Sequence, residues 1–139
     1  MSVESFIDTN VLIYAAAGRH DAPEKNARAW ALLDHANFGL SGQVLAEFYV
    51  NVLTKPKVPL KPSEAATWVD RLSIVPVVPV DADLVREAIR HSHRYKINYW
   101  DAALIAAAER LDAPILYTED LNHDQLYGSV RVVNPFKAN

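Results

Sequence analysis

Residues 5–15 read SFIDTNVLIYA, an apolar run that is broken by the carboxylate of Asp8 and two further polar residues. The residues up to the break, 3–8, are typical of a short buried strand, and 11–17 continue as a helix. A carboxylate between two buried segments is costly to remove from water unless another group pairs with it. The simplest role for Asp8, or for Asn10, is the N-cap of the helix, which both side chains fill well. The rest of the chain offers a second explanation.

The composition narrows the class of protein. With 139 residues, half of them hydrophobic, we expect one domain over 1–139 with a single sizeable core. The absence of cysteine excludes disulfides, thiol nucleophiles and thiolate zinc sites, and it fits a reducing cytoplasm. No stretch resembles a signal peptide or reaches the roughly 18 apolar residues of a membrane span, so we expect a cytoplasmic protein without membrane contact. A net charge of −3 means that any nucleic-acid binding must be local.

Strand-like and helix-like segments alternate along the chain, which predicts an α/β fold with a mostly parallel sheet of four or five strands. Two prolines in 74–80 mark that segment as an edge strand or a strand end. The expected strands are 3–8, 74–80, 114–118 and 130–133. The expected helices are 11–17, 23–37, 42–53, 64–72, 82–95 and 99–111, and the expected N-caps of the last four are Ser41, Ser63, Asp81 and Asn98.

Four carboxylates occupy positions where a charge is unexpected. Asp8 ends the first strand, and Asp120 follows the buried strand 114–118 by two residues. Glu47 lies at the border of the apolar face of its helix, and Asp101 begins a helix that continues with seven apolar residues. Each of the last three also has an ordinary explanation: a solvated helix edge for Glu47, a favourable helix-dipole position for Asp101, and a turn for Asp120.

Sheet topology predicts that these carboxylates converge. Ligand sites of parallel sheets lie at the carboxyl ends of the strands, where Asp8 and Asp120 are placed, and a helix start such as Asp101 fits the same rim. Glu47 is expected to reach in from a crossing helix. Two carboxylates about 4 Å apart repel by about 4 kcal/mol at an effective dielectric constant of about 20, so a bound divalent cation favours such a cluster. Oxygen ligands suit Mg²⁺ or Mn²⁺, which would polarise a phosphoryl oxygen and activate a water molecule.

Four stretches of the chain resemble the PIN-domain ribonucleases, in particular the VapC-like toxins of bacterial VapBC toxin–antitoxin pairs. They are FIDTNVLIYA, LSGQVLAEFYVNV, INYWDAALIAAAERLDAPILYTEDL and VRVVNPF, which together bracket nearly the whole chain. The resemblance implies a compact α/β/α PIN-like fold, metal-dependent cleavage of single-stranded RNA, homodimers, and a cognate antitoxin whose tail inserts into the active-site groove. Because the run QVLAEFYVNVL has more apolar positions than one buried stripe needs, we expect the antitoxin to dock near the helices at 23–37 and 41–54.

The resemblance also assigns residues. The catalytic and metal-binding acids of the family, with Mg²⁺ or Mn²⁺ as cofactor, fall on Asp8, Glu47, Asp101 and Asp120. The fourth acid stays open at this point, because the stretch TEDLNHDQ also contains Glu119 and Asp124. Asp120 is the choice by motif alignment, and Asp124 is the alternative.

Helper residues are expected around the acids. The resemblance implies that a hydroxyl of Thr9 or Thr118 orients an acid or a water molecule. Arg86, Arg90 and Arg94 recur every four residues, a spacing that fits a solvated helix face or, as the sharper alternative, contacts to the RNA backbone.

Two other functions fit part of the pattern. A catalytically silent PIN-like module would only hold a protein partner, although all four acids are present in this chain. A metal-dependent phosphatase with Asp8 as nucleophile resembles sites of the pattern D-x-D, but Asn10 occupies the place of the second acid. RNA cleavage with and without metal separates these possibilities.

Overall fold

The interrupted run folds as β1 (Ser5–Ile7) followed by α1 (Thr9–Ala17). The structure is a computed structural model that describes residues 3–137, so the first two and last two residues of the expected domain lie outside the described residues. Asp8 is the N-cap of α1, since its backbone is extended and its side chain accepts a hydrogen bond from the N–H of Thr9. The capping role is confirmed, and it leaves the second carboxylate oxygen of Asp8 available to other partners.

Within the described residues, six strands form one sheet in the order β3-β2-β1-β4-β6-β5. Every neighbouring pair is parallel except β5 with β6. The strands after β1 are β2 (Phe38–Ser41), β3 (Val77–Val78), β4 (Ile115–Tyr117), β5 (Leu126–Tyr127) and β6 (Val130–Val133). The α/β class and the mostly parallel sheet are therefore confirmed, and β3 is the edge strand that its prolines indicated.

The expected count of four or five strands was wrong because β2 and β5 carry weak sequence signals. β2 is the buried tetrapeptide FGLS, and its glycine lies in a tightly packed place. A Cβ on Gly39 would lie 2.5 Å from Leu111 Cδ1 and 3.1 Å from the carbonyl oxygen of Pro76. β5 is only two residues long and turns into β6 through Gly128, whose φ of 60° favours glycine.

Within residues 3–137 six helices connect the strands. After α1 they are α2 (Pro23–His35), α3 (Gly42–Val52), α4 (Pro62–Leu72), α5 (Ala82–Tyr95) and α6 (Tyr99–Arg110). Ser41, Asp81 and Asn98 cap α3, α5 and α6 as predicted. None of the helices in this part of the chain combines the length and the apolar character that crossing a membrane would need.

The predicted N-cap Ser63 was wrong. α4 begins two residues earlier than expected, at Pro62, with Lys61 as the capping residue. Proline suits the first turn of a helix because its missing N–H would have no partner there. The side chain of Glu64 instead reaches back and accepts a hydrogen bond from the N–H of Lys61 at 2.9 Å.

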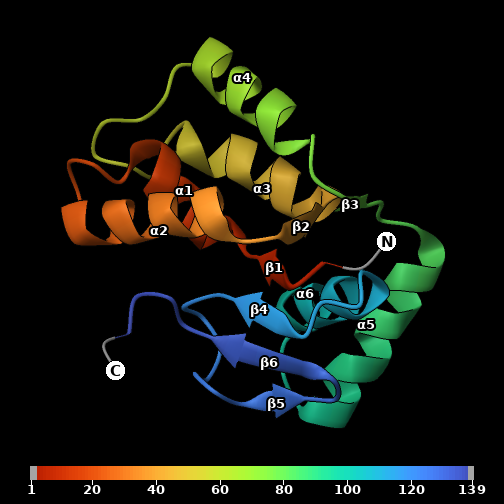
Figure 1. The fold of residues 1–139 in the computed structure, drawn as a ribbon. Helices are drawn as coiled ribbons and strands as arrows, with labels where there is room; N and C mark the ends of the chain where they lie inside the picture. The colour runs from red at the N-terminus through yellow and green to blue at the C-terminus, as the bar shows by residue number, and fades with distance from the viewer. Residues whose placement is uncertain (1–2, 138–139) are drawn as a thin grey trace.

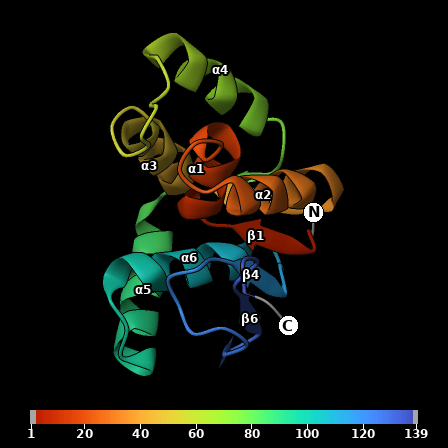
Figure 2. The same ribbon diagram turned by 90° about the vertical axis from the view of Figure 1, so that its left-hand side faces the viewer.

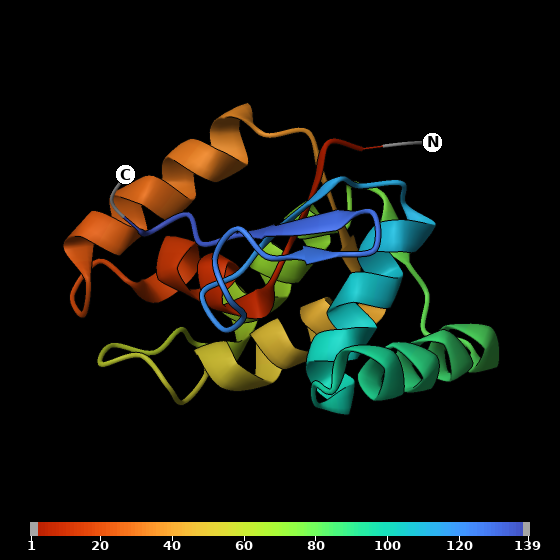
Figure 3. The ribbon, with the colours of Figure 1, turned by 90° about the horizontal axis from the view of Figure 1, so that it is seen from below.

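The helices form two groups on the sheet. α1, α2, α3 and α4 pack together, whereas α5 packs against α6 (Figures 1 and 2). α6 contacts β2, β1, β4 and β6, which explains why its stretch 102–108 is apolar and buried all round. Seen from below, α2 and α5 lie on opposite sides of the molecule with the β5–β6 hairpin between them (Figure 3).

Parallel pairing places the carboxyl ends of β1 and β4 side by side, because Ile7 lies in register with Tyr117. The residues that follow, Asp8 and Thr118, therefore meet at one edge of the sheet. This is the edge at which parallel sheets hold their ligands.

Candidate active site

Asp8 lies almost entirely out of solvent, with 7% of its surface exposed. Its Oδ1 accepts a hydrogen bond from the N–H of Thr9 at 2.7 Å. Its Oδ2 accepts one from the Thr118 hydroxyl at 2.8 Å and one from the Asn10 amide at 3.3 Å. These donors hold the carboxylate in one orientation at the end of β1.

Burial raises the pKa of Asp8 from 3.8 to about 6, because a carboxylate removed from water resists ionisation. The hydrogen bonds from Thr118 and Thr9 lower this pKa, whereas the charges of Asp120 and Glu47 raise it. Asp8 therefore interacts electrostatically with two of the other predicted acids.

Asn10 connects Asp8 to Asp120. Its amide nitrogen donates to Asp120 Oδ2 at 3.1 Å and to Thr118 Oγ1 at 3.4 Å. The Thr118 hydroxyl also accepts from the N–H of Asp120 at 3.1 Å. Asn10 Oδ1 is buried and has no hydrogen-bond partner among the described residues, which leaves an acceptor for a donor at the site. From the sequence we predicted only a helix-capping role for Asn10. Its position two residues after Asp8 was the one signal that could have indicated a place in the site.

Asp101 and Glu47 approach from the helices. Asp101 lies in the first turn of α6, where its Oδ2 accepts from Asn98 Nδ2 at 2.8 Å and its N–H donates to Asn98 Oδ1 at 2.9 Å. Burial raises the pKa of Asp101, and the charge of Asp120 acts in the same direction, against the hydrogen bond from Asn98. Glu47 is exposed on α3 and accepts from Gln43 Nε2 at 2.9 Å.

The structure brings the four predicted acids to one cavity of about 290 Å³. Gln43, Asn98, Trp100 and Leu104 complete its lining. Within residues 3–137, no three His, Asp or Glu side chains are grouped closely enough to hold a metal ion. The acids therefore face a shared space and do not form a closed coordination sphere.

The side chains that line this cavity are of the chemical type that binds a hard divalent cation. The ionisable groups that line it are all carboxylates, and no histidine is among them. The charge of Asp120 raises the pKa of both Asp8 and Asp101, so a cation in the cavity would relieve a repulsion that is present in the fold. The role of these residues as metal ligands is a proposal, developed below.

Asp120 is the residue of the TEDLNHDQ stretch that faces the cavity. Glu119 points elsewhere, because it pairs with Lys25 at 2.9 Å and accepts from the Tyr14 hydroxyl at 2.8 Å. Asp124 is exposed at a backbone position with φ of 67°. Neither residue lines the acidic cavity, so the geometry favours Asp120 as the fourth acid.

The two candidate threonines have different contacts. The Thr118 hydroxyl donates to Asp8, whereas the Thr9 hydroxyl donates to the backbone carbonyl of Val44 at 3.4 Å. Thr9 contacts Asp8 only through its backbone N–H. Orientation of an acid by a hydroxyl therefore falls to Thr118.

The three arginines of α5 are exposed and are not among the residues that line the acidic cavity. Arg86 pairs with Asp83 at 2.5 Å. Arg94 lies over the Tyr95 ring, with its Cζ 5.4 Å from the ring centroid. Together with Arg90 they form a solvated helix face, and their contact with RNA stays a prediction.

An α/β fold that gathers carboxylates at the carboxyl edge of parallel strands defines a class of proteins with an acidic ligand site. The model of the PIN domain family matches residues 5–129, so the chain belongs to the PIN-domain family. The matched segment contains all four predicted acids. No curated protein sequence matches the chain.

Solved structures with the same fold include VapC toxins. VapC20 from Mycobacterium tuberculosis, a sarcin-ricin loop cleaving toxin, has a TM-score of 0.67 at 20% identity, over 84% of this chain and 91% of that one. A toxin–antitoxin complex from Klebsiella pneumoniae gives 0.68 at 18% identity, over 96% and 99%. VapBC2 from Rickettsia felis, bound to a DNA fragment from its promoter, gives 0.59 at 18% identity, over 92% and 96%. The resemblance to VapC-like PIN-domain proteins is confirmed at the level of the fold.

Proposed function

We propose that this PIN-domain protein, with 1–139 as one functional unit, is an endoribonuclease and the toxin of a toxin–antitoxin pair. The observation that carries the proposal is the cavity that all four acids line at the carboxyl edge of the sheet. VapC20, which shares the fold, is described as a sarcin-ricin loop cleaving toxin, and this supports RNA as the substrate class.

The proposed cofactor is Mg²⁺ or Mn²⁺, and the residues that would hold it are Asp8, Glu47, Asp101 and Asp120. Once bound, the ion would polarise a phosphoryl oxygen and lower the pKa of a water molecule that attacks the phosphodiester. The chain itself supplies orientation. The side chains of Thr118 and Asn10 each contact both Asp8 and Asp120. They therefore fix the position of Asp8, at the end of β1, relative to Asp120, which follows β4. These contacts keep oxygen ligands facing the cavity before substrate arrives.

The helices supply the other half of the site. Asn98 holds Asp101 at the start of α6, and Gln43 holds Glu47 one turn along α3. Glu47 and Asp120 are exposed, so RNA approaches from their side, whereas the buried Asp8 forms the floor of the site.

A cognate antitoxin is the proposed protein partner. The similar Klebsiella pneumoniae structure is a toxin–antitoxin complex, which supports this choice. A groove of about 430 Å³ between α3 and α4 has a mainly apolar lining that includes Tyr49 and Val50. It involves the expected helix at 41–54, whereas no residue of the helix at 23–37 lines it. Val50 and Tyr49 are both exposed in this groove, and adjoining exposed apolar side chains are typical of a protein interaction site. A homodimer in the cytoplasm is the proposed working form.

The alternatives predict different chemistry. A phosphatase of the D-x-D kind is disfavoured because Asn10 donates hydrogen bonds to Asp8 and Asp120 and cannot act as a second acid. A silent module would bind its partner without cleaving RNA.

RNA cleavage by the purified protein with Mg²⁺, Mn²⁺ or EDTA tests the proposal. Asp101→Asn is compared with Asp112→Asn, because Asp112 is exposed, lies outside the cavity and has a φ of 54° that asparagine adopts readily. We expect wild type and Asp112→Asn to cleave with metal and to stop in EDTA. Asp101→Asn should lose more than about a hundredfold, since even groups behind the ligands contribute about 10- to 100-fold.

Each other outcome of the cleavage experiment favours a different explanation. Undiminished cleavage by wild type in EDTA, together with an inactive Asp101→Asn preparation, would refute the metal mechanism. Equal cleavage by all three proteins would indicate a contaminating nuclease. Hydrolysis of a phosphate monoester without RNA cleavage would favour the phosphatase, and inactivity on both substrates would favour the silent module.

A further inference from the structure

Trp100 is an exposed tryptophan at the mouth of the acidic cavity. It precedes Asp101 in α6 and is 62% exposed, although α6 is buried from Ala102 onward. It lines the same cavity as the four acids. We propose that Trp100 is the platform on which an unpaired RNA base stacks next to the phosphodiester at the acids, an inference that rests on the ribonuclease function proposed above.

The ring of Trp100 contacts the neighbouring Tyr99 and stays largely exposed. Its centroid lies 5.0 Å from that of Tyr99 in an edge-to-face contact. The N-cap Asn98 anchors the turn that carries both aromatic residues. An accessible aromatic face is what a base needs for stacking.

The surroundings of Trp100 favour a nucleotide over an apolar protein side chain. The cavity beside it is lined by the amides of Gln43 and Asn98 and by carboxylates, with Leu104 as its aliphatic member. Gln43 and Asn98 already bond to Glu47 and Asp101, and the remaining amide hydrogens and carboxylate lone pairs can bond to a base edge or a ribose. An apolar partner would instead take the carboxylates out of water without pairing their charge. The polar lining therefore matches the edge of a stacked base.

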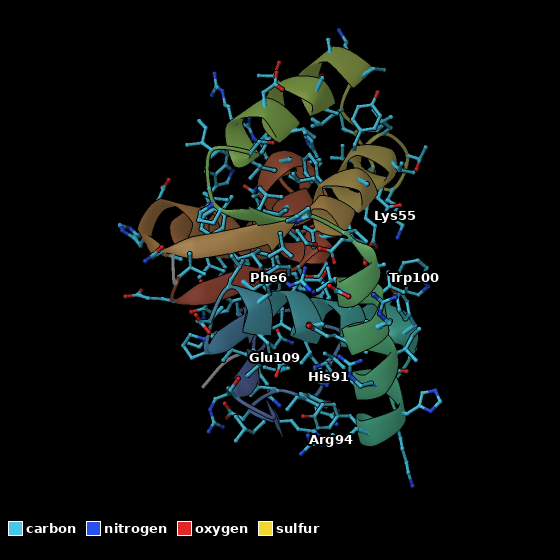
Figure 4. All side chains as sticks on the ribbon, turned by 90° about the vertical axis from the view of Figure 1, so that its right-hand side faces the viewer. Phe6, Lys55, His91, Arg94, Trp100 and Glu109 are labelled. Atoms are coloured by element: carbon cyan, nitrogen blue, oxygen red, sulfur yellow. The ribbon has the colours of Figure 1, made fainter. Side chains whose placement is uncertain are left out.

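A second cavity extends the site past Asp120 to a cation. It measures about 370 Å³ and has Asp120 in common with the acidic cavity. Its lining includes Lys55 together with the carboxylates Asp21 and Glu119. Lys55 is exposed and forms no ion pair with a carboxylate of residues 3–137. Figure 4 shows Lys55 and Trp100 on the same side of the molecule. An RNA strand stacked on Trp100 at the acids can therefore continue toward Lys55, which suits a phosphate.

Trp30 is the matched control within the chain. It is also exposed, at 43%, but it packs on Trp68 at 5.4 Å between their ring centroids. The groove that Trp30 lines contains none of the four acids. Removing Trp30 therefore tests the loss of an exposed tryptophan that lies away from the site.

The experiment measures binding of fluorescently labelled RNA hexamers with Mg²⁺ in the Asp101→Asn background, and a gel checks that the RNA stays intact. Adding Trp100→Ala should weaken binding by about tenfold, whereas adding Trp100→Phe should largely preserve it and adding Trp30→Ala should not change it. Replacing one base of the hexamer by an abasic site should cost about tenfold at one position. That penalty should disappear when Trp100 is alanine.

The opposite results are equally clear. Unchanged affinity of the Trp100→Ala protein, equal abasic penalties in both backgrounds, or no measurable binding by the Asp101→Asn protein would each overturn the proposal. A changed oligomeric state with unchanged RNA affinity would make Trp100 a protein contact and would also overturn it. RNA binding that depends on Trp100, without cleavage by wild type in any metal, would refute the nuclease and leave the stacking platform in place.

Discussion

Asp8 carries two roles with its two oxygens. Oδ1 caps α1 through the N–H of Thr9, and Oδ2 receives the Thr118 hydroxyl and the Asn10 amide at the sheet edge. The roles of Asp8 as helix cap and as member of a ligand site are therefore compatible, because a helix cap at the end of a parallel strand also lies at the edge of the sheet that holds ligands. Burial in that position raises the pKa of Asp8 to about 6.

The raised pKa of Asp8 predicts how the stability of the metal-free protein depends on pH. Between 3.8, the pKa in the unfolded chain, and about 6 in the folded protein, the folded state binds more protons. The free energy of unfolding should therefore fall as pH rises from about 4 to about 7, by on the order of 2 to 3 kcal/mol from this group. Urea unfolding in EDTA should show this slope in wild type and a flatter profile in Asp8→Asn. Equal slopes in both proteins would contradict the assignment.

The two buried threonines make a matched pair for testing what orients Asp8. Thr118→Val removes a donor to a carboxylate and should cost about 1.5 to 3 kcal/mol at pH 8. Thr9→Val removes only a long bond, 3.4 Å, to the carbonyl of Val44 and should cost less. The cost of Thr118→Val should shrink below pH 5, where Asp8 is neutral. A larger cost for Thr9→Val in chemical denaturation at pH 8 would reverse the assignment.

At the scale of elements, the sequence predicts a helix or strand correctly where its capping residue and its hydrophobic pattern indicate the same structure. The helices capped by Asp81 and Asn98 begin where predicted because a capping side chain precedes a clear helical pattern. β2 was missed because four buried residues that include a glycine have no strand periodicity of their own. What makes FGLS a strand is pairing on both sides, with β1 and β3, which is tertiary information.

Gly39 in β2 gives a test of this tight packing. Gly39→Ala would place a Cβ 2.5 Å from Leu111 Cδ1 and 3.1 Å from the Pro76 carbonyl oxygen, so we expect a loss of about 1 to 3 kcal/mol. Gly42→Ala is the control, because its Cβ would approach no atom closer than 3.8 Å and it lies in a helix, where alanine is favoured. Thermal melts of both variants compare them directly. A Gly39→Ala protein as stable as Gly42→Ala would show that β2 tolerates a side chain at this position.

At the scale of the molecule, the acidic cavity is assembled from the junction of β1 and α1, from α3, from α6 with its N-cap, and from the loop after β4. The convergence of Asp8, Asp101 and Asp120 was predictable because the topology of a parallel sheet fixes where strand ends and helix starts meet. The contribution of Asn10 was not predictable, because it depends on side-chain contacts with a residue that lies 110 positions further along the chain. The exposure of Trp100 was also not predictable, since the helix that carries it is apolar and buried from Ala102 onward.

The central claim is that these acids act as one metal site, and thermal melts with EDTA and with Mn²⁺ test it most directly. In EDTA, Asp101→Asn should be as stable as wild type or more stable, by about 1 kcal/mol, because it removes a charge that Asp120 repels. Mn²⁺ should raise the Tm of wild type and of Asp112→Asn more than that of Asp101→Asn, since a ligand stabilises the state that binds it. Identical Mn²⁺ shifts in all three proteins, with Asp101→Asn the least stable in EDTA, would reduce Asp101 to a first-turn helix residue and contradict the account.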